Sequence, residues 1–228
     1  MDPDRIKLSK TRGQNAYRAL LDAIREGQYR PGDPLREEEV AVRIGVSRTP
    51  VREALGRLLE RGLLEAAPGR GVAVAILSMQ QLVELYAMRQ ELEGIVARYA
   101  AQHANEGEIA NLERLNEQFG AAAGDPRLAA EINRRFHARL CDAARNRYLR
   151  QAVQDLQETI ALLRQTTFVQ PGRTVAAVGE HALMIAAIRK RDTQAAEALA
   201  VAHIRAAFET RLAITDSYDV SWPVKSAG

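Results

Sequence analysis

Most of the chain shows hydrophobic residues three and four positions apart, the spacing that is typical of amphipathic helices. In the first quarter this pattern predicts three short helices, at residues 14–26, at residues 35–44 and from Ser47 to Gly62. Gly45 interrupts the pattern between the second and third of these helices. Ser47 is a favourable N-cap for the third helix, and its first turn tolerates Pro50.

Two extended stretches follow the third predicted helix. Residues 63–67 and 71–77 are joined by Pro68-Gly69-Arg70, and the second stretch alternates small and branched residues as a strand does. Three short helices followed by a two-stranded hairpin predict a winged helix-turn-helix. We therefore expect residues 1–77 to form a DNA-binding domain.

From Ser78 to about Thr215 the pattern is helical only. Ser78 and Gln81 fit a capping box, and Leu77 and Leu82 occupy the positions of a hydrophobic staple. Six helices are expected, at residues 79–104, 106–122, 126–144, 147–169, 174–190 and 193–215. The sequence therefore predicts a mainly α protein in which residues 78–228 form an all-helical antiparallel bundle for ligand binding and dimerisation.

Composition narrows the class of protein. A hydrophobic content of 46% with 27% charged residues is typical of globular chains and excludes a wholly disordered or collagen-like one. One cysteine excludes an intrachain disulfide framework and an all-cysteine metal site. The net charge of +3 lies entirely in residues 1–77. The N-terminus does not resemble a secretory signal, and the longest apolar run, residues 182–188, is too short to span a membrane. We expect a cytoplasmic protein with no membrane partner.

The candidate DNA contacts lie at the start of the third helix and at the tip of the hairpin. In a winged helix-turn-helix the N-terminal residues of the third helix meet base edges in the major groove. Arg48, Thr49 and Arg52 hold those positions, and arginine can bind both acceptors of a guanine. Arg70, flanked by glycines, can bring the chain backbone and its charge close to the minor groove or the DNA backbone. One arginine alone would most simply be a solvated side chain, but this combination indicates DNA binding.

The segment GVSRTPVREALGRLLERGLLEAAPGRGVAV resembles the DNA-binding signature of GntR-type bacterial transcription regulators. The resemblance spans residues 14–77, and the helical remainder resembles the FadR-type effector domain of the same family. It implies base or phosphate contacts from Arg48, Thr49, Arg52 and Gly69. Glu38 stands where FadR has a DNA-contacting arginine on the second helix, so we expect Arg36 to provide any contact from that helix.

Three of the four histidines lie within apolar stripes of different predicted helices. These are His137, His181 and His203, whereas His103 lies near a helix end. A single core histidine is usually just hydrogen-bonded. Three on separate helices can meet in the core of a bundle, and imidazole is a good ligand for zinc, nickel, iron or copper.

The family resemblance extends this prediction. Many FadR-type domains bind a divalent metal through three histidines and an aspartate four residues before the first. The segments NRRFH, GEHALMIAAI and AHIRAAF resemble that pattern and imply a site of Asn133, His137, His181 and His203. Asparagine replaces the aspartate, so the fourth ligand brings an amide oxygen without a negative charge. We expect a divalent ion, with zinc or nickel favoured over manganese or iron.

Arg89 interrupts an apolar stripe of the first helix of the bundle, and two interpretations remain open. It can form an intrahelical pair with Glu93, four residues on. It can also face the ligand cavity and clamp a carboxylate in a bidentate fork. In many members of the resembling family an arginine at this place helps to hold an acidic effector.

These patterns predict a ligand-responsive transcription regulator, a repressor that binds a two-fold operator as a homodimer. Its expected effector is a small carboxylate. One alternative is a metal-dependent hydrolase that uses the three histidines. We do not expect an enzyme, because the sequence contains no HExxH, P-loop or GxSxG motif. The other alternative is a FadR-like regulator that binds its ligand without metal.

Overall fold

A computed structural model describes residues 3–67, 69, 71–163 and 165–217, which form two compact units. The first unit contains the described residues up to Leu77 together with residues 157–163. The second contains the remaining described residues, from Ser78 onward. The end of helix α7 and the turn after it thus belong to the first unit.

The first unit is a winged helix-turn-helix. Its elements are α1 (Pro3–Arg25), β1 (Pro34–Leu35), α2 (Glu37–Ile44), α3 (Arg48–Glu60), β2 (Leu64–Ala67) and β3 (Gly71–Val74). The strands form an antiparallel sheet in the order β1-β3-β2. Helix α1 packs on α3, and the unit's core includes the fully buried side chains of Leu20, Val40 and Leu58. Gly45 joins α2 to α3 with a φ of 69°, a left-handed conformation that favours glycine.

Two expectations for this unit were wrong in detail. The first helix begins at Pro3, not at residue 14, because helix can extend beyond the residues that show an apolar stripe, and proline is favoured in a first turn. The second helix begins at Glu37, not at residue 35. Pro34 and Leu35 instead pair with Ala73 and Val72 of β3 as a third strand, so the sheet is more than a hairpin.

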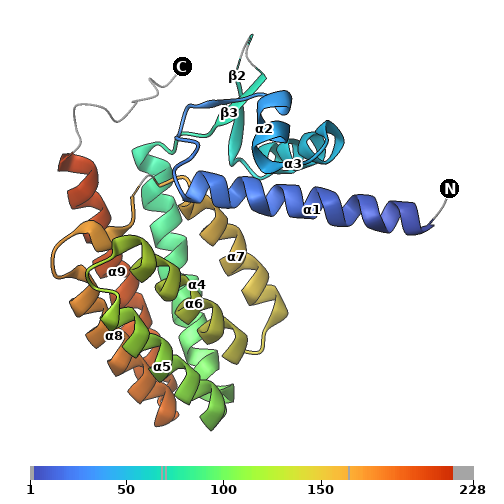
Figure 1. Ribbon diagram of the computed structural model, residues 1–228. Helices are drawn as coiled ribbons and strands as arrows, with labels where there is room; N and C mark the ends of the chain where they lie inside the picture. Colours follow the sequence, from blue (N-terminus) through green and yellow to red (C-terminus); the bar gives the residue numbers. More distant parts are fainter. Residues whose placement is uncertain (1–2, 68, 70, 164, 218–228) are drawn as a thin grey trace. The chain divides into compact units, whose positions relative to one another are not determined.

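The second unit is all-helical, as predicted. It contains α4 (Met79–His103), α5 (Glu106–Ala121), α6 (Pro126–Ala143), most of α7 (Arg147–Ile160), a 3-10 turn η1 (Thr167–Val169), α8 (Arg173–Arg189) and α9 (Thr193–Ser217). Helix α4 packs along α9, and α8 packs against α5 and α9 (Figure 1). The predicted capping box is present, since Ser78 and Gln81 exchange side-chain and backbone hydrogen bonds.

The helix expected at 147–169 is shorter than predicted. Helix α7 ends at Ile160. The turn that follows it buries the side chains of Ala161, Leu162 and Leu163. Thr166 then caps η1 by accepting a hydrogen bond from the backbone of Phe168. The apolar spacing continued through this break because the turn and η1 also bury their side chains.

The core of the second unit brings α4, α5, α6, α8 and α9 together around side chains such as Val96, Phe119, Phe136 and Ile188. Within the described part of the chain, no helix is both long enough and apolar enough to span a membrane.

Candidate functional site

The exposed start of α3 carries the predicted DNA contacts. Arg48 is the first residue of this helix, and Thr49 and Arg52 are exposed beside it. A hollow of about 550 Å³ lies along this surface and is lined by residues of α2, α3 and β3. Arg36 is also exposed and pairs with Glu39 at 3.2 Å. Gly69 lies at the tip between β2 and β3 with a φ of +73°, whereas Arg70 lies outside the described residues.

Both arginines of α3 contact glutamates at the start of α2. Arg52 donates two parallel hydrogen bonds of 2.9 Å to the carboxylate of Glu37. Arg48 donates one of 2.8 Å to Glu38 and lies 3.7 Å from Glu37. Sequence reasoning treated Glu38 only as a departure from the family pattern and missed both contacts. These contacts join residues of α2 to residues of α3 across the turn between them. The spacing of residues within one helix does not predict contacts of this kind.

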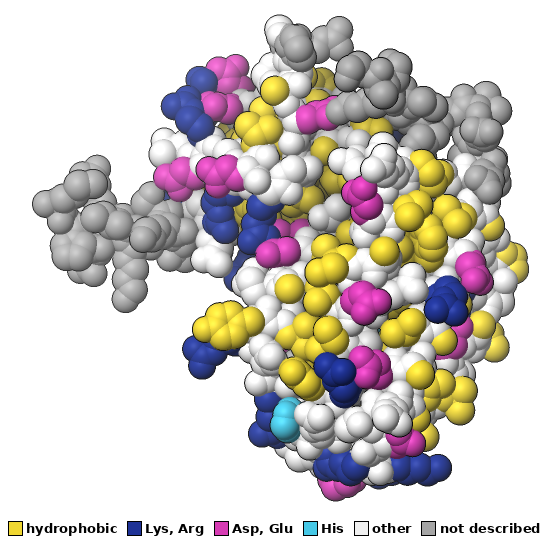
Figure 2. Space-filling view, turned by 180° about the vertical axis from the view of Figure 1, so that it is seen from behind, with side chains coloured by type: hydrophobic (Ala, Val, Ile, Leu, Met, Phe, Trp, Pro, Cys, Tyr) yellow, Lys and Arg dark blue, Asp and Glu magenta, His cyan; other side chains and the backbone are white. Residues whose placement is uncertain are grey.

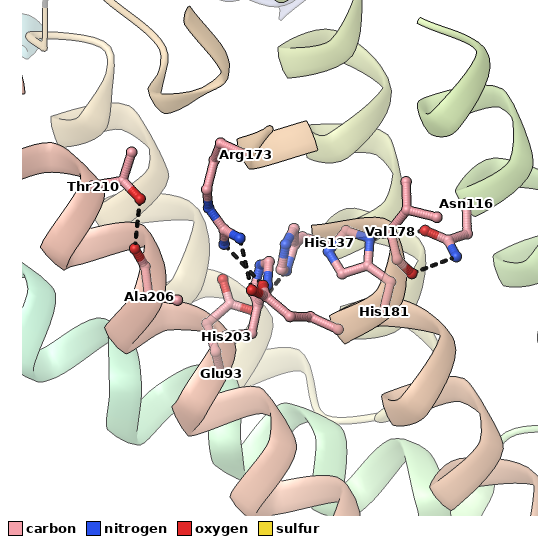
Figure 3. Close-up of polar contacts among 10 residues, drawn as sticks. Glu93, Asn116, His137, Arg173, Val178, His181, His203, Ala206 and Thr210 are labelled. Carbon is pink, nitrogen blue, oxygen red and sulfur yellow. Dashed lines mark hydrogen bonds and ion pairs between the residues drawn. The ribbon is translucent and has the colours of Figure 1, made fainter. Parts of the chain in front are cut away.

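The second unit brings the three predicted histidines to one point. His137 of α6, His181 of α8 and His203 of α9 are buried, and their candidate ligand atoms all lie within 4.8 Å of one another. Figure 3 shows the three imidazoles converging from different helices. Phe136 stacks on His181 with ring centroids 4.0 Å apart, which limits rotation of that ring. Such a cluster can hold a metal ion through neutral imidazole nitrogens.

Each imidazole is held through its Nδ1 atom by a different neighbour. His137 pairs with Glu93 at 3.1 Å, His181 with the Asn116 side-chain oxygen at 3.2 Å, and His203 with Glu180 at 2.5 Å. Asn116 is oriented in turn, because its amide donates to the carbonyl oxygen of Val178 at 3.0 Å. Partners of this kind fix the tautomer and ring orientation of metal-binding histidines and leave Nε2 for the ion.

Several polar atoms in this region are buried without a hydrogen-bond partner. They include the Nε2 atoms of His137 and His181 and the side-chain oxygen of Asn133, which lies one turn before His137 on α6. A buried polar atom without a partner is costly, so atoms of this kind indicate a missing ligand. The three atoms are all metal-ligand types, and the residues present therefore fit a divalent ion.

The electrostatics keep the two carboxylates charged and the imidazoles of His181 and His203 neutral. Burial by itself would raise the pKa of Glu93, but His137, Arg89 and His203 together lower it to about 2. Burial by itself would also raise the pKa of Glu180, but hydrogen bonds from His203 and Arg173 lower this pKa to about 2. Burial lowers the pKa of His203 to about 4 and that of His181 well below its usual value. A neutral imidazole is the form that binds metal.

Arg89 is buried within α4, with 8% of its surface exposed. Its guanidinium lies 4.9 Å from the centre of the Tyr86 ring, and its Nε atom is buried without a partner. Its charge helps to lower the pKa of Glu93, as the ion-pair interpretation expects. The unpartnered Nε leaves part of the fork available for a carboxylate, so the structure is compatible with both interpretations.

Arg173 is a second buried cation beside the cluster, and sequence reasoning missed it. Its guanidinium binds the Glu180 carboxylate through two contacts of 2.7 and 2.8 Å, and only 7% of its surface is exposed. The two residues are seven positions apart, a spacing that places them on one face of α8. That spacing and the position of Glu180 beside His181 are the signals that could have indicated it.

Two families match the chain, and together they span most of it. The family described as bacterial regulatory proteins of the gntR family matches residues 12–74. The family described as the FCD domain matches residues 84–206. The first match includes α2, α3 and all three strands of the wing, and the second includes all three clustered histidines.

Curated relatives and solved structures agree with these matches. The chain is 33% identical to the HTH-type transcriptional repressor RspR of Escherichia coli over 84% of this chain and 85% of that one. It is 34% identical to the Nta operon transcriptional regulator of Aminobacter aminovorans, over 82% of this chain and 88% of the relative. The solved structure of E. coli McbR/YncC has the same fold, with a TM-score of 0.78, 23% identity, and 90% of this chain and 97% of that one covered.

Proposed function

The chain belongs to the GntR family of bacterial transcriptional regulators, and from this premise we propose that it is a metal-dependent repressor controlled by a small organic acid. Membership confirms the predictions of a regulator and of a protein that is not an enzyme, and it removes the hydrolase alternative. The proposal adds the metal, the effector and the homodimer. The convergence of three buried imidazoles from three helices is the observation that carries it.

In the proposed complex, α3 enters the major groove of operator DNA. Arg48, Thr49 and Arg52 then contact bases or phosphates, and Gly69 and Arg70 of the wing approach the backbone. A two-fold operator requires two such units, so we propose that the regulator acts as a homodimer. Hydrophobic side chains lie exposed on the molecule, as Figure 2 shows for one face. In the helical unit they include Val83, Val175 and Leu183, which a second copy could cover. Because the partner is chromosomal DNA, the site of action is the cytoplasm.

The proposed metal site consists of His137, His181 and His203 with the amide oxygen of Asn133. Bound there, a divalent ion supplies a positive centre that can attract an anionic ligand. Glu93, Asn116 and Glu180 orient the imidazoles. A ligand set of nitrogen atoms and one neutral oxygen favours zinc or nickel over manganese or iron.

Charge balance supports an anionic effector. Without metal, the carboxylates of Glu93 and Glu180 are matched by the guanidiniums of Arg89 and Arg173. A divalent ion held by neutral ligands would add two positive charges that these two acid–base pairs do not offset. Buried charge without a counter-charge is costly, so a small carboxylate would complete the site. We propose that Arg89 receives one of its oxygens.

The effector can act on DNA binding through the helices that carry the site. The proposed ligands and Arg89 come from α4, α6, α8 and α9, so an anion that binds among them changes the spacing of these helices. Helix α4 begins at Met79, only a few residues after β3 of the wing ends at Val74. A connection this short leaves little chain to absorb a movement of α4.

Two measurements test this function. Selection of genomic fragments by the purified protein should return a two-fold sequence, and its affinity should depend on Arg48 and Arg52. Metal analysis after reconstitution with zinc, nickel or manganese should find close to one ion per chain. Protein that binds the operator but retains no metal at neutral pH would instead support the metal-free regulator.

A further inference from the structure

The first turn of α2 is acidic, and it faces the arginines that begin α3. Glu37, Glu38 and Glu39 are consecutive, and acidic residues are favoured at a helix N-terminus by the helix dipole. That preference explains the composition of the turn but not the direction of its contacts. Glu37 and Glu38 bind the two arginines of α3, so the surface expected to meet negatively charged DNA carries as many negative as positive charges there.

The contact between Glu37 and Arg52 leaves the end of the guanidinium free. Arg52 uses Nε and Nη2, the side edge of its fork, with both hydrogen bonds at 2.9 Å. A guanidinium has five N–H donors, so Nη1 and the second hydrogen of Nη2 remain for the two acceptors of a guanine. The Glu37 side chain is only 29% exposed, against 69% for that of Arg52. Glu37 can therefore hold Arg52 in one orientation while the arginine binds a base.

The contacts of Arg48 use the end of its guanidinium instead. Nη1 donates to Glu38 at 2.8 Å and Nη2 lies 3.7 Å from Glu37, so both terminal nitrogens face carboxylates. The side chains of Arg48 and Glu38 are 57% and 74% exposed. A phosphate that approaches Arg48 from this side must displace the Glu38 carboxylate and is also repelled by its charge.

We infer that the acidic turn of α2 sets the sequence selectivity of α3 through two different residues. Glu37 is a positioning residue that presents Arg52 to a base, and it strengthens binding to the correct sequence. Glu38 competes with phosphate for Arg48, and it weakens binding to every sequence alike. The inference rests on the proposed contact of α3 with DNA and goes beyond it, because it assigns opposite effects to two neighbouring glutamates.

The test compares Glu37→Gln with Glu38→Gln, which remove the same charge from adjacent positions. The probes are a duplex selected from a random pool by the wild-type full chain and a scrambled duplex of equal length. Glu37→Gln should weaken binding to the selected duplex by roughly tenfold and leave the scrambled duplex nearly unchanged, since one bidentate base contact loses its preorganised geometry. Glu38→Gln should tighten binding to both duplexes and steepen the dependence of log K on log salt by about 0.9 for each new phosphate contact.

Glu39→Gln is the matched control, because it removes a charge from the same turn but its partner is Arg36. It should leave the ratio of the two affinities at the wild-type value. Melting curves establish that each variant is folded before binding is measured. One contrary result is that Glu37→Gln shifts the affinities for the selected and the scrambled duplex by the same factor, as is expected only of Glu38→Gln. The other is that neither variant shifts any affinity. With either result the acidic turn contributes only net charge, and the inference is wrong.

Arg52→Ala separates this inference from its premise. If Arg52→Ala fails to weaken binding to the selected duplex, the assignment of α3 as the DNA-contacting helix is itself wrong. If Arg52→Ala weakens binding and Glu37→Gln does not, α3 binds DNA and only the role of Glu37 is overturned.

Discussion

Glu180 accepts a hydrogen bond from Nδ1 of His203 at 2.5 Å, and the two side chains come from different helices of the bundle. The same carboxylate binds Arg173 in a bidentate pair, so His203, Glu180 and Arg173 form one connected group. Because Nδ1 is occupied in this way, the Nε2 atom of His203 is the one left for a metal ion. The orientation of a proposed ligand thus depends on a residue that would not itself touch the metal.

Glu180→Gln should reduce metal affinity by roughly 10- to 100-fold, the usual cost of losing a partner that orients a metal ligand. Glutamine can still accept the hydrogen bond, but it brings no negative charge to the imidazole. Competition with a chelator of known affinity measures the change. Glu113→Gln, which removes an exposed partner of Arg189 on α5, should leave metal affinity unchanged. Equal affinity in the two variants would contradict the role of Glu180.

His137→Ala, His181→Ala and His203→Ala should each lower the bound metal and the metal-dependent rise in melting temperature. An ion that binds only the folded protein adds to its stability, by about 2.7 kcal/mol at a free concentration 100 times the dissociation constant. Metal analysis and thermal melts with and without added ion measure both effects. The control is His103→Ala, because His103 is exposed at the end of α4. Wild-type metal content in all three variants would exclude the cluster as a metal site.

Asn133→Asp should tighten metal binding, because an anionic oxygen replaces a neutral amide oxygen that is buried without a partner. The gain should appear in a chelator competition and in a larger metal-dependent shift of melting temperature. Asn111→Asp adds the same charge to α5, where the Asn111 oxygen accepts from Arg114, and should not tighten binding. If Asn133→Asp leaves affinity unchanged, Asn133 does not coordinate the ion.

Arg48→Ala and Arg52→Ala should each abolish specific operator binding while the fold and the proposed dimer persist. A lost bidentate base contact of Arg52 costs about 1–3 kcal/mol per half-site, and a two-fold operator has two half-sites. Loss of a phosphate contact of Arg48 weakens binding to every sequence. Both side chains are exposed, so their removal leaves no cavity in the core. Fluorescence anisotropy with a selected duplex measures the loss, and Arg114→Ala in the helical unit serves as the control. Unchanged affinity in both variants would contradict the assignment of α3.

The sequence predicted the winged helix, the helical bundle and the histidine cluster because each has a strong local signal. Helical spacing placed His137, His181 and His203 on buried faces, and buried faces of one bundle meet in its core. The ends of elements were less predictable. The expected helix at 147–169 ends at Ile160 because a buried turn maintains the same apolar spacing as a helix.

Contacts between distant charged residues were the least predictable part of the site. Glu37 and Arg52 are 15 positions apart, and Asn116 and His181 are 65 apart, so no helical period relates them. Such pairs depend on how two helices pack, and a single sequence does not contain that information. Glu180 and Arg173 share one helix, but their connection to the histidine cluster depends on the packing of α9, which places His203 beside Glu180.

Arg89 and the bound metal should together select an anionic effector. In metal-loaded protein, a small carboxylate but not its amide should raise the melting temperature and change operator affinity, because only the anion offsets the charge of the metal and Arg89. Arg89→Ala should remove both responses and leave operator binding without effector unchanged. Arg89→Lys, which keeps the charge but loses the fork, should retain only part of them. A thermal-shift screen of mono- and dicarboxylates against matched amides supplies the ligand. Full sensitivity in Arg89→Ala would show that Arg89 serves only as the partner of Glu93, whose pKa its charge lowers.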